Sequence, residues 1–107
     1  MEWAYKTKTV NTKALKYAKR IRIASGKCAI GEGIWISLYT MSGECYCDIT
    51  KEFGFELEKG FGYVEANSDA ERFVIEQNLG ADTKVRLTSG FNTYNLYKFT
   101  NEKLLKI

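Results

Sequence analysis

Hydrophobic and polar positions alternate most clearly along residues 34–50. Two runs rich in β-branched and aromatic residues flank Ser42-Gly43, which is the signature of a hairpin with a two-residue loop. Counting outward from that loop predicts the cross-strand pairs Ile36 with Ile49, Leu38 with Cys47, Thr40 with Cys45, Tyr39 with Tyr46, Ser37 with Asp48 and Trp35 with Thr50. Because side chains alternate with period two, one face carries Ile, Leu and Cys, and the other carries Trp and Tyr.

Shorter alternating stretches predict further strands on both sides of this hairpin. They cover residues 3–10, 20–24, 63–66, 84–88 and 93–99. The Gly-rich passage 53–62 is expected to be an irregular loop or a short strand.

Two segments have helical signals. Ser68 followed by Glu71 forms a capping box, so a helix is expected to run from there to about residue 79, with a left-handed Gly80 at its end. A second, thinner apolar stripe predicts a short helix over 13–19, capped by Asn11 or Thr12. The expected fold class is α+β: a mostly antiparallel β-sheet built around the 34–50 hairpin, with one or two helices packed on a face.

The length of 107 residues fits a single domain, with 45% hydrophobic and 27% charged residues. The chain has no His, which excludes Ser-His and Cys-His nucleophile systems and His-ligated metals. No apolar stretch approaches the length of a membrane span, and the N-terminus lacks a signal-peptide core. Three cysteines are an odd count, so we expect free thiols and a cytoplasmic location.

The net charge of +3 conceals a segregation along the chain. Residues 1–30 hold eight Lys or Arg and one Glu, whereas residues 44–82 hold ten Asp or Glu and three Lys or Arg. Residues 83–107 are again basic. This basic N-terminal segment and acidic middle either steer a partner or neutralise each other within the fold.

The basic segment contains the candidates for nucleic-acid binding. Phosphate contacts would come from Lys13, Lys16, Lys19, Arg20 and Arg22. Base stacking would come from the interleaved aromatics Tyr5, Tyr17, Tyr94 and Tyr97. The alternative is a solvated basic edge, because no helix-turn-helix or single-strand-binding signature accompanies the charges.

The candidates for protein binding lie in the middle of the chain. The face with Trp35, Tyr39 and Tyr46 is either covered by a helix or exposed as an interface anchor, because Trp and Tyr dominate interface hot spots. The acids Glu56, Glu58 and Glu65 would address a basic partner surface. Nothing in the sequence places two carboxylates around one cleft, so an enzymatic role for them is not expected.

The cysteines have a structural and a metal-binding interpretation. Cys45 and Cys47 are expected on the core face of the hairpin, because free Cys is among the most buried residue types. The alternative is a small zinc site formed by Cys28, Cys45 and Cys47. Core packing is favoured, so no cofactor is expected.

Several motifs in the C-terminal three quarters resemble a known family. They are Gly43-Glu44-x-Tyr46, Asp48-Ile49-Thr50, Gly62-Tyr63-Val64-Glu65-Ala66-Asn67, Glu76-Gln77-Asn78-Leu79-Gly80 and Ser89-Gly90-Phe91-x-Thr93-Tyr94-x-Leu96-Tyr97-Lys98-Phe99. This order, over roughly residues 28–99, is similar to an uncharacterised domain family encoded on phages, plasmids and conjugative elements of Gram-positive bacteria. Family members commonly have Pro where this chain has Asn95, and an Asp-Thr-Asn-Asn run where it has residues 65–68.

The resemblance implies a small accessory protein of a mobile element. Such proteins are often inhibitors of host defence, including anti-CRISPR proteins that bind the effector nuclease. We therefore expect a non-enzymatic binding protein that sterically inhibits a host defence complex. A basic nucleic-acid-binding accessory protein and a small Cys-ligated zinc protein are the alternatives.

Overall fold

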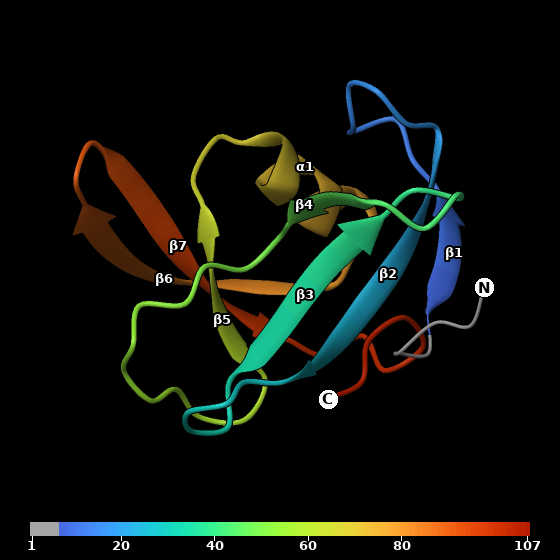
Figure 1. The fold of residues 1–107 in the computed structure, drawn as a ribbon. Helices are drawn as coiled ribbons and strands as arrows, with labels where there is room; N and C mark the ends of the chain where they lie inside the picture. Colours follow the sequence, from blue (N-terminus) through green and yellow to red (C-terminus); the bar gives the residue numbers. More distant parts are fainter. Residues whose placement is uncertain (1–6) are drawn as a thin grey trace.

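Two antiparallel sheets pack on a shared core in the computed structural model, which describes residues 7–107 (Figure 1). The first sheet has the strand order β1-β2-β3-β4, with the bounds Lys8–Asn11, Arg20–Lys27, Ile34–Tyr39 and Cys45–Asp48. The second sheet has the order β5-β7-β6, with β5 at Phe61–Glu65, β6 at Gly80–Ser89 and β7 at Asn92–Phe99. The single helix of the described residues is α1, Asp69–Glu76.

The core lies where β2 and β3 cross β5 and β7 in Figure 1. Its members come from both sheets, the helix and the loops: Leu15, Ile21, Ile23, Ile34, Ile36, Leu38, Ile49, Val64, Phe73, Val74, Leu79, Tyr97, Phe99 and Leu105. The predicted α+β class with a mostly antiparallel sheet is therefore confirmed. Within residues 7–107, no helix is long and apolar enough to cross a membrane.

The 34–50 hairpin forms, but its loop has three residues instead of two. The Gly43 N–H donates to the Thr40 carbonyl at 3.0 Å, and the Thr40 N–H donates to the Glu44 carbonyl at 2.8 Å. Gly43 has a φ of 98°, the left-handed conformation that closes a three-residue loop. The two-residue loop Ser42-Gly43 was therefore the wrong prediction.

A β-bulge follows from this longer loop. The pairs Ser37–Asp48 and Leu38–Cys47 form as predicted, but Tyr39 pairs with Cys45. Tyr46 is the extra residue on β4, so the predicted pairs Tyr39–Tyr46 and Thr40–Cys45 are wrong.

The bulge redistributes the side chains of β4 between the two faces of the sheet. Cys45 is exposed, Cys47 is half-buried, and Tyr46 packs against the core. The predicted core position of Cys45 is therefore wrong, and Tyr46 does not share a face with Trp35 and Tyr39. The bulge breaks the strict alternation on which both predictions rested.

Helix α1 begins as its capping box predicts. The Ser68 Oγ accepts from the Glu71 N–H at 3.1 Å, while Phe73 and Val74 are fully buried. The helix ends earlier than predicted, at Glu76, and Asn78 takes the left-handed conformation with a φ of 53°.

Gly80 therefore has a different role from the predicted helix stop. It begins β6, and a Cβ at this position would lie 2.3 Å from the Lys98 carbonyl oxygen. Close approach of β7 requires the glycine here.

The boundaries of β2 and β6 also differ from the sequence prediction. Strand β2 continues to Lys27 instead of fading at Ala24-Ser25, because Gly26 leaves room for the Trp35 indole, whose Nε1 would lie 2.8 Å from a Cβ there. Strand β6 is longer than predicted and is interrupted near Lys84, which has a φ of 71°. The strand predicted at 3–10 is described only from residue 7, and its earlier part lies outside the described residues.

Candidate functional site

Residues 12–19 form a closed loop, and the helix predicted there is absent. The Thr12 N–H donates to the Lys19 carbonyl at 2.8 Å, which brings the two ends of the loop together as in an Ω-loop. Leu15 is 6% exposed and packs in the core, whereas Lys13, Lys16 and Lys19 are exposed. The loop therefore buries Leu15 in the core and exposes its three lysines to solvent without forming a helix.

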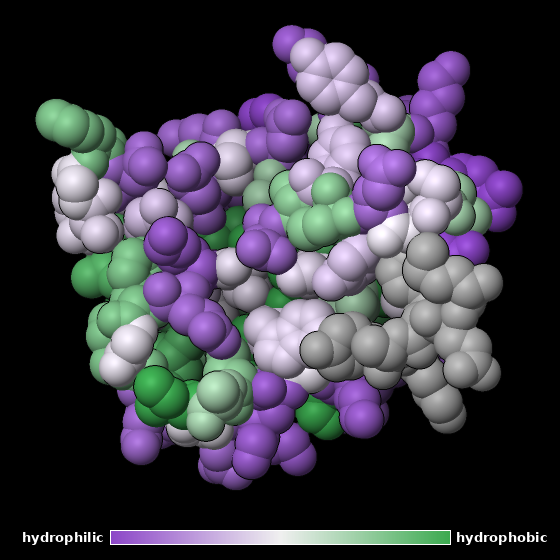
Figure 2. Space-filling model, viewed as in Figure 1, coloured by the Kyte–Doolittle hydropathy of each residue, from purple (hydrophilic) through white to green (hydrophobic). Residues whose placement is uncertain are grey.

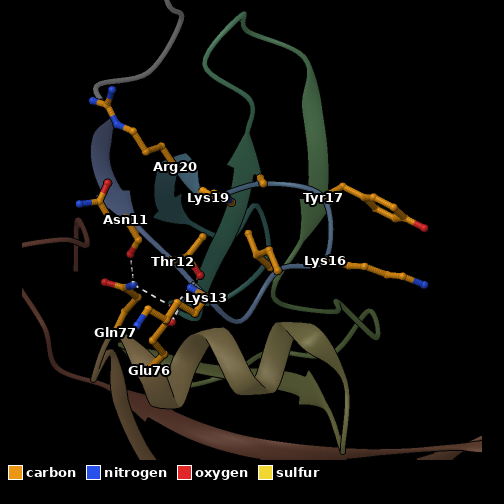
Figure 3. A pocket seen from close by; sticks show the side chains of 11 residues that line it. Asn11, Thr12, Lys13, Lys16, Tyr17, Lys19, Arg20, Glu76 and Gln77 are labelled. Atoms are coloured by element: carbon orange, nitrogen blue, oxygen red, sulfur yellow. Dashed lines mark hydrogen bonds between the residues drawn. The ribbon is translucent and has the colours of Figure 1, made fainter.

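The loop is fixed to the C-terminal end of α1 by one carboxylate. Glu76 accepts from the Thr12 hydroxyl at 2.6 Å and from the Lys13 N–H at 2.7 Å (Figure 3). Gln77 adds a hydrogen bond from Nε2 to the Asn11 carbonyl at 2.8 Å. These contacts hold the first residues of the loop against α1, and the bond from Thr12 to Lys19 closes residues 12–19 into a loop instead of a helix.

The same hydrogen bonds affect the ionisation of Glu76. Burial alone would raise its pKa, but the hydrogen bonds from Thr12, from the Lys13 N–H and from Gln77 lower that pKa below its ordinary value. Glu76 is therefore ionised at neutral pH and remains a hydrogen-bond acceptor for the loop.

A groove of about 910 Å³ lies between this loop and the end of α1. Four of the five cations nominated for nucleic-acid binding line it: Lys13, Lys16, Lys19 and Arg20. We call this feature the basic groove; its other lining residues are Asn11, Thr12, Leu15, Tyr17, Ala18, Glu76 and Gln77. Arg22, the fifth nominated cation, is half-buried on β2 and does not line it.

The nominated aromatics separate sharply in exposure. Tyr17 is 80% exposed and lines the basic groove, whereas Tyr94 and Tyr97 are buried. Tyr5 lies outside the described residues. At this end of the molecule, where the β1–β2 loop lies in Figure 1, hydrophilic side chains project in Figure 2.

A second cavity, of about 600 Å³, brings together two residues nominated for protein binding. Trp35 and Glu65 line it with Asp48 and Glu52, and we call it the acidic cavity. Its remaining lining residues are Ser37, Ile49, Thr50, Lys51, Ser68, Ala70 and Tyr94. Asp48 is held in place by a hydrogen bond from the Ser37 hydroxyl at 2.7 Å.

The other residues nominated for protein binding do not line the acidic cavity. Glu56 and Glu58 are exposed on the long β4–β5 connection, where the Glu56 backbone passes close to Gly31. Tyr39 is half-exposed on β3, and the Tyr46 hydroxyl accepts from the Tyr17 N–H at 3.1 Å. The six nominated residues therefore do not form one surface.

Cys28 is likewise separated from Cys45 and Cys47. The Cys28 N–H donates to the Gly33 carbonyl, whereas Cys47 pairs with Leu38 on β3. Leu38 follows Gly33 by five residues, which corresponds to about 17 Å of extended chain between the two positions. Among residues 7–107, no group of three His, Cys, Asp or Glu side chains has a metal-binding arrangement.

The surroundings of Cys28 and Cys47 raise their thiol pKa values, which lowers the fraction of reactive thiolate. Burial, together with the hydrogen bond and charge of Glu52, raises the pKa of Cys28 to about 12. Burial and the neighbouring Cys45, Asp48 and Asp69 raise the pKa of Cys47 to about 11.

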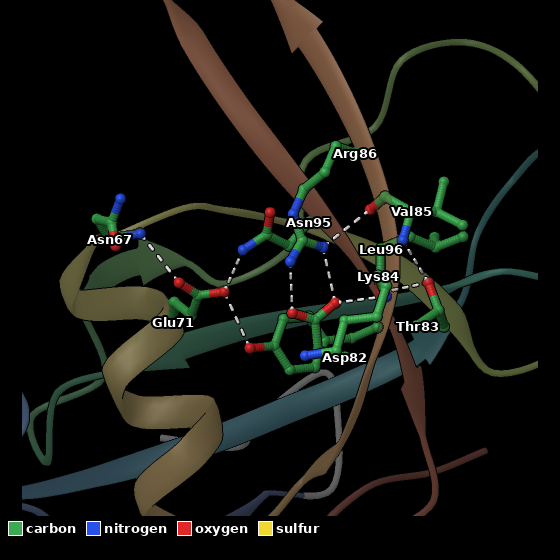
Figure 4. A network of polar contacts seen from close by, with 10 residues as sticks. Asn67, Glu71, Asp82, Thr83, Lys84, Val85, Arg86, Asn95 and Leu96 are labelled. Atoms are coloured by element: carbon green, nitrogen blue, oxygen red, sulfur yellow. Dashed lines mark hydrogen bonds and ion pairs between the residues drawn. The ribbon is translucent and has the colours of Figure 1, made fainter.

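A polar network that the sequence did not reveal fixes α1 to the second sheet (Figure 4). Glu71 accepts from the Asn67 N–H, from Asn95 Nδ2 at 2.6 Å and from the Tyr97 hydroxyl at 2.9 Å. Burial raises the pKa of Glu71, but these hydrogen bonds outweigh it and leave the pKa lowered. The capping-box pattern identified Glu71, but only for its local role.

An aromatic cluster, also missed, organises the long β4–β5 connection. The Phe53 ring contacts Tyr94 edge-on at a centroid distance of 4.9 Å and Tyr63 at 5.6 Å, and Phe55 stacks beside Phe53 at 6.1 Å. The aromatic content of residues 53–63 was the available signal, but the pairing partners are distant in sequence.

These features describe a small α+β domain with one basic and one acidic concave surface. A domain of unknown function, DUF4313, matches residues 26–107, and the chain belongs to that family. The expected resemblance to an uncharacterised domain family is thus confirmed at that level. Neither curated proteins nor solved structures gave a match. The β1–β2 loop precedes the matched segment, whereas Glu76 and Gln77 lie within it.

Proposed function

We propose that this protein is a non-enzymatic nucleic-acid-binding accessory protein that holds the phosphate backbone in the basic groove. One observation carries the proposal: four nominated cations line a single groove beside a largely exposed tyrosine. Against these four cations, the described lining residues supply one carboxylate, Glu76, which is engaged by three hydrogen-bond donors from the loop and Gln77. The groove is therefore positively charged where a phosphate would lie.

Salt dependence tests this proposal directly. If each of the four cations neutralises one phosphate, binding of a labelled 20-mer falls about 50- to 150-fold between about 50 and 200 mM salt. The measurement is fluorescence anisotropy with single-stranded and duplex probes.

A matched pair of variants locates the binding surface. Lys13→Gln/Lys16→Gln/Lys19→Gln removes three charges from the basic groove, and Lys27→Gln/Lys103→Gln/Lys106→Gln removes three exposed charges that do not line it. The first triple variant is expected to lose most of the affinity and to flatten the salt slope by about 0.7 to 0.9 per cation. Equal losses in both variants, or no binding to either probe at low salt, would reject the proposal.

A second candidate function is inhibition of a host defence complex through protein contact. It is supported by the acidic cavity, where Trp35, Asp48 and Glu65 combine an aromatic wall with negative charge. Such a surface complements a basic nucleic-acid channel of an effector nuclease. The resemblance to families of phages and mobile elements suggests an anti-CRISPR role in the bacterial cytoplasm.

A cleavage assay with a purified CRISPR effector and its guide tests this second candidate. The protein is expected to block target cleavage, and Glu65→Lys is expected to relieve that block. Glu58→Lys is the control, because it makes the same charge change outside the cavity. Uninhibited cleavage by the unmodified protein, or equal effects of both variants, would contradict this function.

A further inference from the structure

Tyr17 is displayed in a way that core packing does not explain. It is 80% exposed, although Leu15, two residues earlier, is buried. Figure 3 shows the Tyr17 and Lys16 side chains extending side by side away from the loop. A large aromatic ring that is held out in solvent beside a cation is available for contact with a ligand.

Hydrogen bonds from two directions fix the backbone at Tyr17. The Tyr17 N–H donates to the Tyr46 hydroxyl at 3.1 Å, and the loop ends are joined by the bond from Thr12 to Lys19. Tyr46 reaches this position because it is the bulged residue of β4 and turns toward the core. The position of the ring is therefore preorganised, which lowers the entropic cost of binding.

Lys16 adds charge at the ring itself. Its Nζ lies over the Tyr17 ring, 5.4 Å from the centroid, in a cation–π arrangement. One ring face is thus associated with the ammonium group, and the high exposure of Tyr17 leaves the other face open. A base stacked on that open face would place its phosphates within reach of the lysines on either side.

The exposed ring distinguishes between single strands and duplexes. In a duplex the base faces are stacked on each other, so a surface tyrosine meets only base edges, sugars and phosphates. An unpaired base presents its whole face, and stacking on an aromatic side chain tolerates any base. The cations alone would serve either ligand, whereas Tyr17 serves only the single strand.

We propose that the β1–β2 loop binds single-stranded nucleic acid, with one base stacked on Tyr17 and the flanking phosphates on Lys13, Lys16 and Lys19. This inference rests on the proposed nucleic-acid function and specifies its ligand. In this proposal the Tyr17 ring stacks with a base, and the basic groove binds the sugar-phosphate backbone of the nucleic acid.

Anisotropy titrations with labelled dT12, rU12 and a 12-base-pair duplex test the inference. The unmodified protein is expected to bind at least one single strand more tightly than the duplex, and the comparison of dT12 with rU12 distinguishes DNA from RNA. Tyr17→Ala is expected to weaken single-strand binding about 5- to 150-fold, the range of one lost stacking contact. Tyr17→Phe is expected to retain most of the affinity, because the ring remains.

Phe91→Ala is the matched control. Phe91 is 107% exposed on the turn between β6 and β7, where a hydrophobic side chain projects in Figure 2, and it does not line the basic groove. Its loss is expected to leave binding unchanged. Thermal melts followed by circular dichroism verify that each variant is folded, as the exposure of both rings predicts.

The outcomes separate this inference from the function on which it rests. If Tyr17→Ala binds every probe like the unmodified protein while the Lys→Gln triple variant loses affinity, the nucleic-acid function stands and the stacking role is wrong. Duplex binding as tight as single-strand binding overturns the inference in the same way. Absence of binding to all three probes at low salt rejects both.

Discussion

The 34–50 hairpin and the 12–19 loop both place a leucine in the core, but their backbones are held by different kinds of hydrogen bonds. Each inserts a leucine into the shared core, Leu38 from the hairpin and Leu15 from the loop. In the hairpin, the backbone hydrogen bonds are made between β3 and β4 and between β3 and the neighbouring β2. The loop instead relies on the closing bond from Thr12 and on the side chain of Glu76. The stability of the hairpin is therefore distributed over many contacts, and the conformation of the loop depends on a few.

Removing the two leucines is the strongest test of this comparison. Leu38→Ala is expected to cost about 3 to 4 kcal/mol of unfolding free energy, because a central strand cannot collapse into the cavity. Leu15→Ala is expected to cost about 2 kcal/mol, because a loop can move inward. Urea denaturation measures both, and equal costs would show that the loop is as rigid as the sheet.

Removing the carboxylate anchor comes next in size. Glu76→Ala deprives the Thr12 hydroxyl and the Lys13 N–H of their acceptor, and we expect a loss of about 1 kcal/mol because Glu76 is exposed to solvent. Hydrogen exchange is expected to speed up at Lys13 and Ala14 but not at Leu38. Faster exchange in the hairpin as well would mean that the two regions are coupled.

The contrast between these regions also explains what the sequence could predict. Ladder contacts follow from alternation, so the strands at 34–39, 45–48 and 92–99 were predicted with small boundary errors. The loop was predicted as a helix because residues 13–19 do have a helical pattern. The loop is held in part by Glu76, more than sixty residues away, and no local signal identifies this partner.

The same reasoning applies within the candidate site. Positions of Lys13, Lys16 and Lys19 were predictable as exposed, since their charge opposes burial. Their convergence on one groove with Arg20 depends on the closure of the loop, which is a tertiary property. In the hairpin, one additional loop residue was enough to exchange the faces of Cys45 and Tyr46.

Acidification is expected to loosen the loop before the hairpin. The pKa of Glu76 is lower in the folded protein than its ordinary value of 4.5, so its stabilising contribution is complete above that pH and is lost as the pH falls through the lower folded value. NMR chemical shifts of the Lys13 and Ala14 amides are expected to follow this titration, with little change at Leu38.

The variant Glu76→Gln controls for other carboxylates. The pKa of Glu71 is also lowered below its ordinary value, but its partners are on β7 and at the α1 N-terminus. A shift of the Lys13 amide that persists in Glu76→Gln would assign the transition to another group.

Thiol labelling has the smallest effect on the protein and tests the bulge directly. Cys45 is exposed, Cys47 is half-buried with its pKa raised to about 11, and Cys28 is buried with its pKa raised to about 12. Because the thiolate is the reactive form, iodoacetamide at neutral pH is expected to modify Cys45 first, Cys47 slowly and Cys28 only upon unfolding. Mass spectrometry of the digested protein gives the order. If Cys45 is instead as protected as Cys47, as strict alternation on one core face would require, then β4 has no bulge and Tyr46 faces away from the core.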